Sequence, residues 1–144
     1  MTYRRELNKL EDNALWRDAE KIAKAIFDTY DRLPEDEKMV VKWKLRDRAF
    51  DLTSDIAEAC GTFIPKDIEY NLSQARRSVF SMKNAYRYLG RQGFLKIDPQ
   101  LMVDMDKLVT DIDVQIKKSW HDIDEIETDR RDTKPAPSEK GPES

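Results

Sequence analysis

The single histidine and the single cysteine are the residues best suited to catalysis in this chain, and neither lies in a favourable setting. His121 follows Trp120 near the expected end of a helix, so any Ser-His-Asp triad would have to form around this one residue. Cys60 lies at the expected C-terminal end of another helix, where the helix dipole raises the pKa of a thiol. We interpret His121 as a surface histidine and Cys60 as a small buried hydrophobic residue.

Metal and cofactor sites are also not predicted. A single histidine excludes a histidine-rich site, and the Glu-x-x-His pairs that hold dinuclear metal in helical bundles are absent. No glycine-rich phosphate loop is present. Acidic side chains crowd one expected helix, but calcium sites need ligands on a loop. We interpret these aspartates as a solvated face: Asp104, Asp106, Asp111, Asp113, Asp122 and Asp124. The sequence therefore predicts no enzymatic activity, no metal and no cofactor.

Charge is distributed unevenly along the chain, although the formal net charge is only −3. Residues 66–96 contain seven basic residues against two acidic ones, a formal charge of +5. Residues 98–126 contain eight acids against three bases, a formal charge of −5. A nearly neutral chain thus contains a strongly polarised pair of segments.

Four basic side chains of the first of these segments fall on one face of a helix. They are Arg76, Lys83, Arg87 and Arg91, and we call them the basic ridge. One interpretation is that the ridge pairs with the acidic segment, inside one bundle or across a subunit contact. The other is that it docks nucleic-acid phosphates or an acidic protein, which suits the bidentate contacts of arginine.

The elements that carry these residues are predicted to be long amphipathic helices. Of the 144 residues, 39% are hydrophobic and 38% are charged, with only four glycines, a balance typical of helices with a narrow buried stripe. No segment alternates with the period of a strand.

The lone cysteine cannot form an intrachain disulfide, and no apolar run approaches the roughly 20 residues that span a bilayer. We expect a cytoplasmic protein that does not bind membranes.

Four segments show the helical repeat of apolar residues. The first is ended by Pro34, and the second starts with the acids 35–37 and stops at Gly61, which we predict to be a helix C′ residue. The third follows Pro65 and is closed by Gly90 and Gly93; the fourth runs from the N-cap Asp98 to about 126. The repeat predicts these core residues: Leu45, Ile56, Leu72, Val79, Leu108 and Ile112.

Short connections make successive helices antiparallel neighbours, so the predicted fold is all-α, an up-down-up-down four-helix bundle. The bundle is expected over residues 10–127, after an N-terminal extension of residues 1–9. Residues 128–144 are rich in proline and poor in apolar side chains, and we expect them to form a disordered C-terminal tail.

Several motifs in this order resemble a known family of bacterial four-helix bundles. The first two are Trp16 with its apolar stripe and Leu33-Pro34 followed by acids. The second helix adds Asp55-Ile56-Ala57-Glu58-Ala59-Cys60-Gly61, the third ends on Tyr88-Leu89-Gly90, and the fourth contains Ser119-Trp120. Over residues 10–126 the chain resembles the 23S rRNA intervening-sequence proteins and their relatives, the accessory variability (Avd-like) proteins of diversity-generating retroelements.

The resemblance implies a ring-shaped homopentamer without enzymatic activity. In the retroelement branch it also implies binding to a reverse transcriptase and to nucleic acid through a basic surface. We therefore expect a non-catalytic oligomeric adaptor that presents a charged surface to a partner protein or ribonucleoprotein. The alternative is a direct RNA- or DNA-binding accessory factor that uses the basic ridge.

Overall fold

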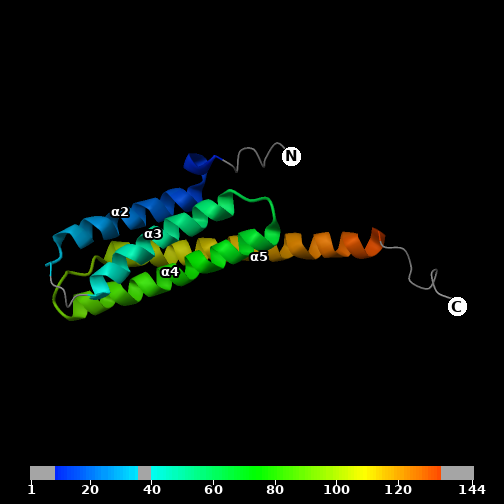
Figure 1. Cartoon of the computed structure of the whole chain (residues 1–144). Helices are drawn as coiled ribbons and strands as arrows, with labels where there is room; N and C mark the ends of the chain where they lie inside the picture. Colours follow the sequence, from blue (N-terminus) through cyan, green and yellow to red (C-terminus); the bar gives the residue numbers. More distant parts are fainter. Residues whose placement is uncertain (1–8, 36–39, 134–144) are drawn as a thin grey trace.

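Four antiparallel helices follow one another in the computed structural model, which describes residues 9–35 and 40–133 (Figure 1). They are α2 (Ala14–Arg32), α3 (Val40–Cys60), α4 (Pro65–Arg91) and α5 (Pro99–Thr133), preceded by the short 3₁₀ helix η1 (Leu10–Asp12). Each helix packs against the next, and α5 returns to contact α2. The described part of the chain contains no strand. The predicted all-α bundle with antiparallel helices is confirmed.

Side-chain caps fix the starts of two helices. The side chain of Asn13 accepts a hydrogen bond from the backbone N–H of Trp16 over 2.9 Å at the start of α2. Asp98 accepts one from the backbone N–H of Gln100, also over 2.9 Å, directly before Pro99 at the first position of α5. The predicted N-cap at Asp98 is confirmed. The described part of α3 begins only at Val40, so Glu35 lies outside the helix, and residues 36–39 lie outside the described part.

The two predicted glycine stops differ in conformation. Gly61 follows the end of α3, and its N–H donates to the carbonyls of Ala57 and Glu58 over 3.1 Å, but its φ is not positive. At the end of α4, Gly93 has a φ of +83°, and the N–H of Phe94 donates to the carbonyl of Leu89 over 3.0 Å. This hydrogen bond and the one from Gly93 to Gly90 form a Schellman motif.

Gly90 lies inside α4 and has a packing role instead. A Cβ at this position would lie 2.6 Å from Cδ1 of Ile97 and would displace that side chain, so glycine lets the following connection pack closely against the helix. This contact brings the chain back toward Tyr86, whose hydroxyl accepts a hydrogen bond from the backbone N–H of Asp98 over 2.9 Å.

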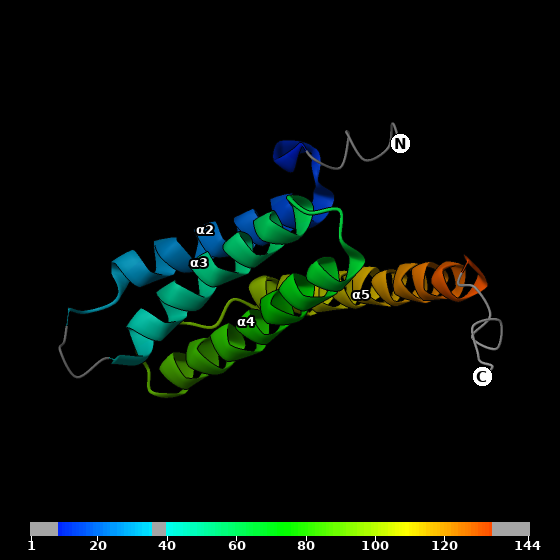
Figure 2. The ribbon, with the colours of Figure 1, turned by 45° about the vertical axis from the view of Figure 1, so that its right-hand side comes forward.

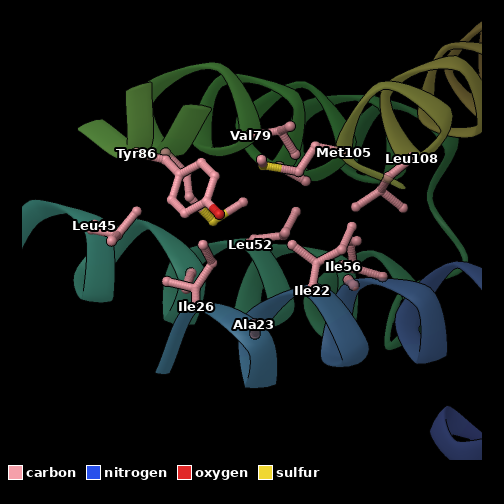
Figure 3. Close-up of a cluster of buried hydrophobic side chains, with 14 of the residues drawn as sticks. Ile22, Ala23, Ile26, Leu45, Leu52, Ile56, Val79, Tyr86, Met105 and Leu108 are labelled. Carbon is pink, nitrogen blue, oxygen red and sulfur yellow. The ribbon is translucent and has the colours of Figure 1, made fainter. Parts of the chain in front are cut away.

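The apolar stripes of all four helices meet in one core (Figure 3). All six predicted core residues are buried: Leu45, Ile56, Leu72, Val79, Leu108 and Ile112. Tyr86 is the largest fully buried side chain, and Figure 3 shows it between the side chains of Leu45 and Val79. The buried stripe lies on every third or fourth residue of each helix, as the repeat predicted.

Helix α5 is longer than predicted. We expected it to end near residue 126 and a tail to start at 128, but the helix continues to Thr133. The loss of apolar residues after 126 ends the buried stripe without ending the helix. Arg130 and Arg131 lie in the last turn, where positive charge interacts favourably with the helix dipole. Figures 1 and 2 show α5 extending past the start of α4. The expected tail beyond 133 and residues 1–8 of the expected N-terminal extension lie outside the described residues.

Within the described ranges, no helix is both long and apolar enough to cross a membrane.

Candidate interaction surface on helix α4

Three of the polar contacts between α4 and α5 recur at intervals of seven residues on both helices. Arg76 Nε donates to the carboxylate of Asp113 over 2.7 Å, and Lys83 Nζ donates to Asp106. The indole N–H of Trp120 donates to the carboxylate of Glu69. Two of the four residues of the basic ridge therefore pair with acids of the neighbouring helix inside the same chain.

Phe80 lies between the two paired cations of the ridge. The guanidinium carbon of Arg76 is 5.0 Å from the centroid of its ring, and Lys83 Nζ is 5.8 Å from the same point. Cation–π contacts of this kind hold a positive charge over an aromatic face. The charges of Arg76 and Lys83 are also balanced by their ion pairs with Asp113 and Asp106.

The other two ridge residues, Arg87 and Arg91, remain exposed and make no ion pair with any residue of the described ranges. The seven-residue repeat of contacts supplies no partner for them, because its next positions after Lys83 and Asp106 are Gly90 on α4 and Pro99 on α5. Two arginines of the ridge therefore present their positive charge to the surroundings.

Aromatic side chains alternate with these arginines along the outer surface of α4. Three are 45–63% exposed, although aromatic side chains of this size are usually more buried. We call this surface the α4 outer face, and its residues are Tyr70, Arg77, Phe80, Arg87, Tyr88 and Arg91. The only acids of α4 are Asp67 and Glu69, near its start. The face therefore combines positive charge with exposed rings.

Arg77 belongs to this face but not to the predicted ridge. Steps of four back from Arg91 and then a step of seven lead to Arg76, which lies on the flank of α4 that faces α5. The spacing of Tyr70, Arg77, Asn84 and Arg91, at intervals of seven, marks the outer surface and could have found it.

The remaining candidates for chemistry, His121 and Cys60, lie on different helices, α5 and α3. His121 is 71% exposed and contacts the carboxylate of Glu125 over 3.2 Å, so its interpretation as a surface histidine is confirmed. Cys60 is half-buried rather than fully buried, and burial raises the pKa of its thiol. In residues 9–35 and 40–133 no group of three or more histidine, cysteine, aspartate or glutamate side chains could hold a metal ion.

Asp55, on α3, is an ionisable group whose raised pKa its sequence neighbours did not indicate. The pKa of its carboxyl group is raised from 3.8 to about 6, first by partial burial and then by the nearby carboxylates of Asp51 and Glu58, while Arg48 lowers it. Arg48 is itself held by Asp51 over 2.9 Å and by the hydroxyl of Ser81 over 3.3 Å.

Comparison with known proteins identifies no relative of the chain: no protein-family model, no curated protein and no solved structure matches it. The resemblance to intervening-sequence and retroelement accessory proteins therefore stays a prediction.

Proposed function

We propose that this protein is a non-catalytic oligomeric adaptor whose α4 outer face docks a partner protein or ribonucleoprotein. The observation that carries the proposal is the division of the basic ridge. Arg76 and Lys83 are neutralised inside the chain, whereas Arg87 and Arg91 point outward beside exposed aromatic rings. Arginine and tyrosine are the side chains most enriched where proteins bind one another.

Exposed apolar side chains on α3 support self-association. Trp43 is 44% exposed and Phe50 is 62% exposed, and they lie seven residues apart on one surface of the helix. Single exposed apolar residues are common, but two large aromatic rings on one helix face are typical of a surface that another chain covers. A homo-oligomer, the pentamer that the resemblance implies, would cover this surface with a second copy and leave the α4 outer face for the partner.

A retroelement reverse transcriptase is the partner class that the resemblance implies. Such an enzyme works with bound nucleic acid, so either its acidic surface or its nucleic acid would complement the arginines of the α4 outer face.

Direct binding of RNA or DNA is the second candidate function. The alternation of arginine with exposed tyrosine and phenylalanine favours it, because single-stranded nucleic acids stack their bases on aromatic rings while cations contact the phosphates. Arg77, Arg87 and Arg91 would supply these cations from one helix.

A salt titration separates the two functions. For direct binding we expect a labelled single-stranded RNA oligonucleotide to bind with an affinity that falls steeply with salt, and Arg87→Gln with Arg91→Gln to reduce the slope by roughly one per lost phosphate contact. The matched control is Lys21→Gln with Lys117→Gln, two exposed cations on other helices. Absence of RNA binding at low salt would reject the second function and leave the adaptor.

The adaptor itself is tested by its association. Trp43→Ser with Phe50→Ser is expected to lower the molar mass in solution, and Arg87→Gln with Arg91→Gln is expected to leave that mass unchanged. The opposite pattern would place the α4 outer face in the contact between subunits and remove it as the docking face.

A further inference from the structure

A cleft of about 470 Å³ lies at the end of the bundle where α3 connects to α4. It is lined by the first turns of α2, the last turn of α3, the start of α4 and the middle of α5. It is separate from the α4 outer face, because none of the arginines of that face lines it.

The cleft exists because the helices begin at different levels. Asp18, near the start of α2, lies 4.0 Å from Lys107 of α5, so α2 begins beside the first half of α5. Helix α5 continues, and its Trp120 contacts Glu69 near the start of α4. Past Ala14, the first residue of α2, only α3, α4 and α5 therefore enclose the core. Figures 1 and 2 show α5 running on past the start of α2.

The inner wall of the cleft is part of the hydrophobic core. Ile56, Ala59 and Leu72 line it, and each is at most 7% exposed. Leu15 and Ile68 are half-buried beside them and pack against the same core. Apolar surface that is left at the end of an incomplete bundle gains free energy when an apolar molecule covers it.

The rim of the cleft is mostly acidic. Asp18, Asp111 and Asp122 line it, against one lysine, Lys118. Lys107 Nζ contacts Asp111 over 2.7 Å and Asp18 over 4.0 Å, so these two carboxylates already form ion pairs within the chain. Asp122 is half-buried and makes no ion pair with a residue of the described ranges. It is the carboxylate open to a cation from outside.

We propose that this cleft binds a small apolar molecule that bears one amine cation. The volume lies within the range of about 300–1,000 Å³ that small-molecule sites occupy. The apolar body of the ligand covers Ile56, Ile68 and Leu72, and its ammonium group pairs with Asp122 at the rim. A partner helix would instead need a groove that runs along the helices, and this cleft is confined to one end.

Three probes of one shape test the proposal: 1-adamantylamine, 1-adamantanol and adamantane-1-carboxylate. We expect the amine to bind most tightly and the carboxylate least, as measured by calorimetry on the full chain. Cys60 lines the cleft and is the only cysteine, so alkylation of its thiol reports on occupation of this site. The amine is expected to slow this alkylation in proportion to its binding.

Asp122→Asn isolates the role of the rim. It should weaken binding of the amine by about two- to fivefold, the effect of one partly exposed ion pair, and leave binding of the alcohol unchanged. Asp124→Asn, an exposed carboxylate of α5 outside the cleft, is the matched control and should change neither. Equal affinity for all three probes, or equal weakening of amine and alcohol by Asp122→Asn, would overturn the proposal.

The chain's own N-terminal segment is the competing occupant. Deletion of residues 2–8 should leave amine binding and Cys60 alkylation unchanged if the cleft serves a ligand. A rise of tenfold or more in the affinity for the amine or in the rate of Cys60 alkylation on deletion would assign the cleft to this segment and overturn the proposal. The proposal would also be overturned if none of the three probes bound at millimolar concentration.

Discussion

Arg76 on α4 and Asp113 on α5 lie opposite each other, with 2.7 Å between Nε and the nearer carboxylate oxygen. The contact recurs seven residues away in both directions, as Lys83 with Asp106 and as Glu69 with Trp120. Two antiparallel helices keep such a repeat only in one register, because a slide by one turn would place every cation beside the wrong neighbour. The polar repeat therefore selects how far α5 extends past α4.

A double-mutant cycle measures the coupling of this pair. Arg76→Gln, Asp113→Asn and the double variant are compared by chemical denaturation. Both side chains are about 40% exposed, so we expect a coupling energy of about 0.2–1 kcal/mol that shrinks at high salt. A coupling of zero at low salt would mean that the pair does not help to set the register.

Charge reversal separates the paired part of the basic ridge from its exposed part. Lys83→Glu places a like charge beside Asp106 and is expected to lower the free energy of unfolding. Arg87→Glu with Arg91→Glu changes two exposed residues without an ion pair in the described ranges, and should alter it by no more than about 0.5 kcal/mol. Equal losses in the two variants would contradict the division of the ridge.

Core truncations test the packing of α4 against α5. Leu72→Ala and Ile112→Ala each remove a side chain that is at most 3% exposed, so each should cost about 2–5 kcal/mol of unfolding free energy. Val103→Ala, at an exposed position of α5, is the control and should cost much less. Unchanged melting temperatures for both core variants would contradict the bundle.

Stability is expected to depend on pH through Asp55. Its pKa in the folded chain, about 6, lies above the ordinary value of 3.8, so the fold favours the neutral acid. The stability from this group is fully present below about pH 4 and is lost as the pH rises through about 6. The Asp55→Asn side chain is neutral at every pH. The free energy of unfolding of this variant should therefore increase relative to that of the unmodified chain as the pH rises from about 4 to about 6. A difference that is constant with pH would show that Asp55 ionises normally in the fold.

The helices and the core were predictable because each helix repeats its apolar residues at helical spacing. Leu72 and Val79 could be assigned to the core from neighbours three and four residues away on the same helix. The cap at Asp98 and the turn at Gly93 were predictable for the same reason, since both depend on local sequence.

Features that depend on the relative position of two helices were not predictable. The sequence placed Arg76 and Arg87 on one ridge, but only the packing of α5 against α4 shows that Arg76 pairs with Asp113, whereas Arg87 pairs with no acid of residues 9–35 and 40–133. The cleft depends on the level at which α2 begins beside α5, which no single segment encodes. The length of α5 was missed because its last turns bury no stripe, although they remain helical.

Light scattering at micromolar concentration tests the central claim most directly, because an oligomeric adaptor must associate before it binds anything else. We predict that the unmodified chain has the molar mass of a homo-oligomer, five times the 17.0 kDa subunit if the ring is the pentamer that the resemblance implies. A mass of 17.0 kDa across this concentration range would identify a monomer and contradict the proposed function.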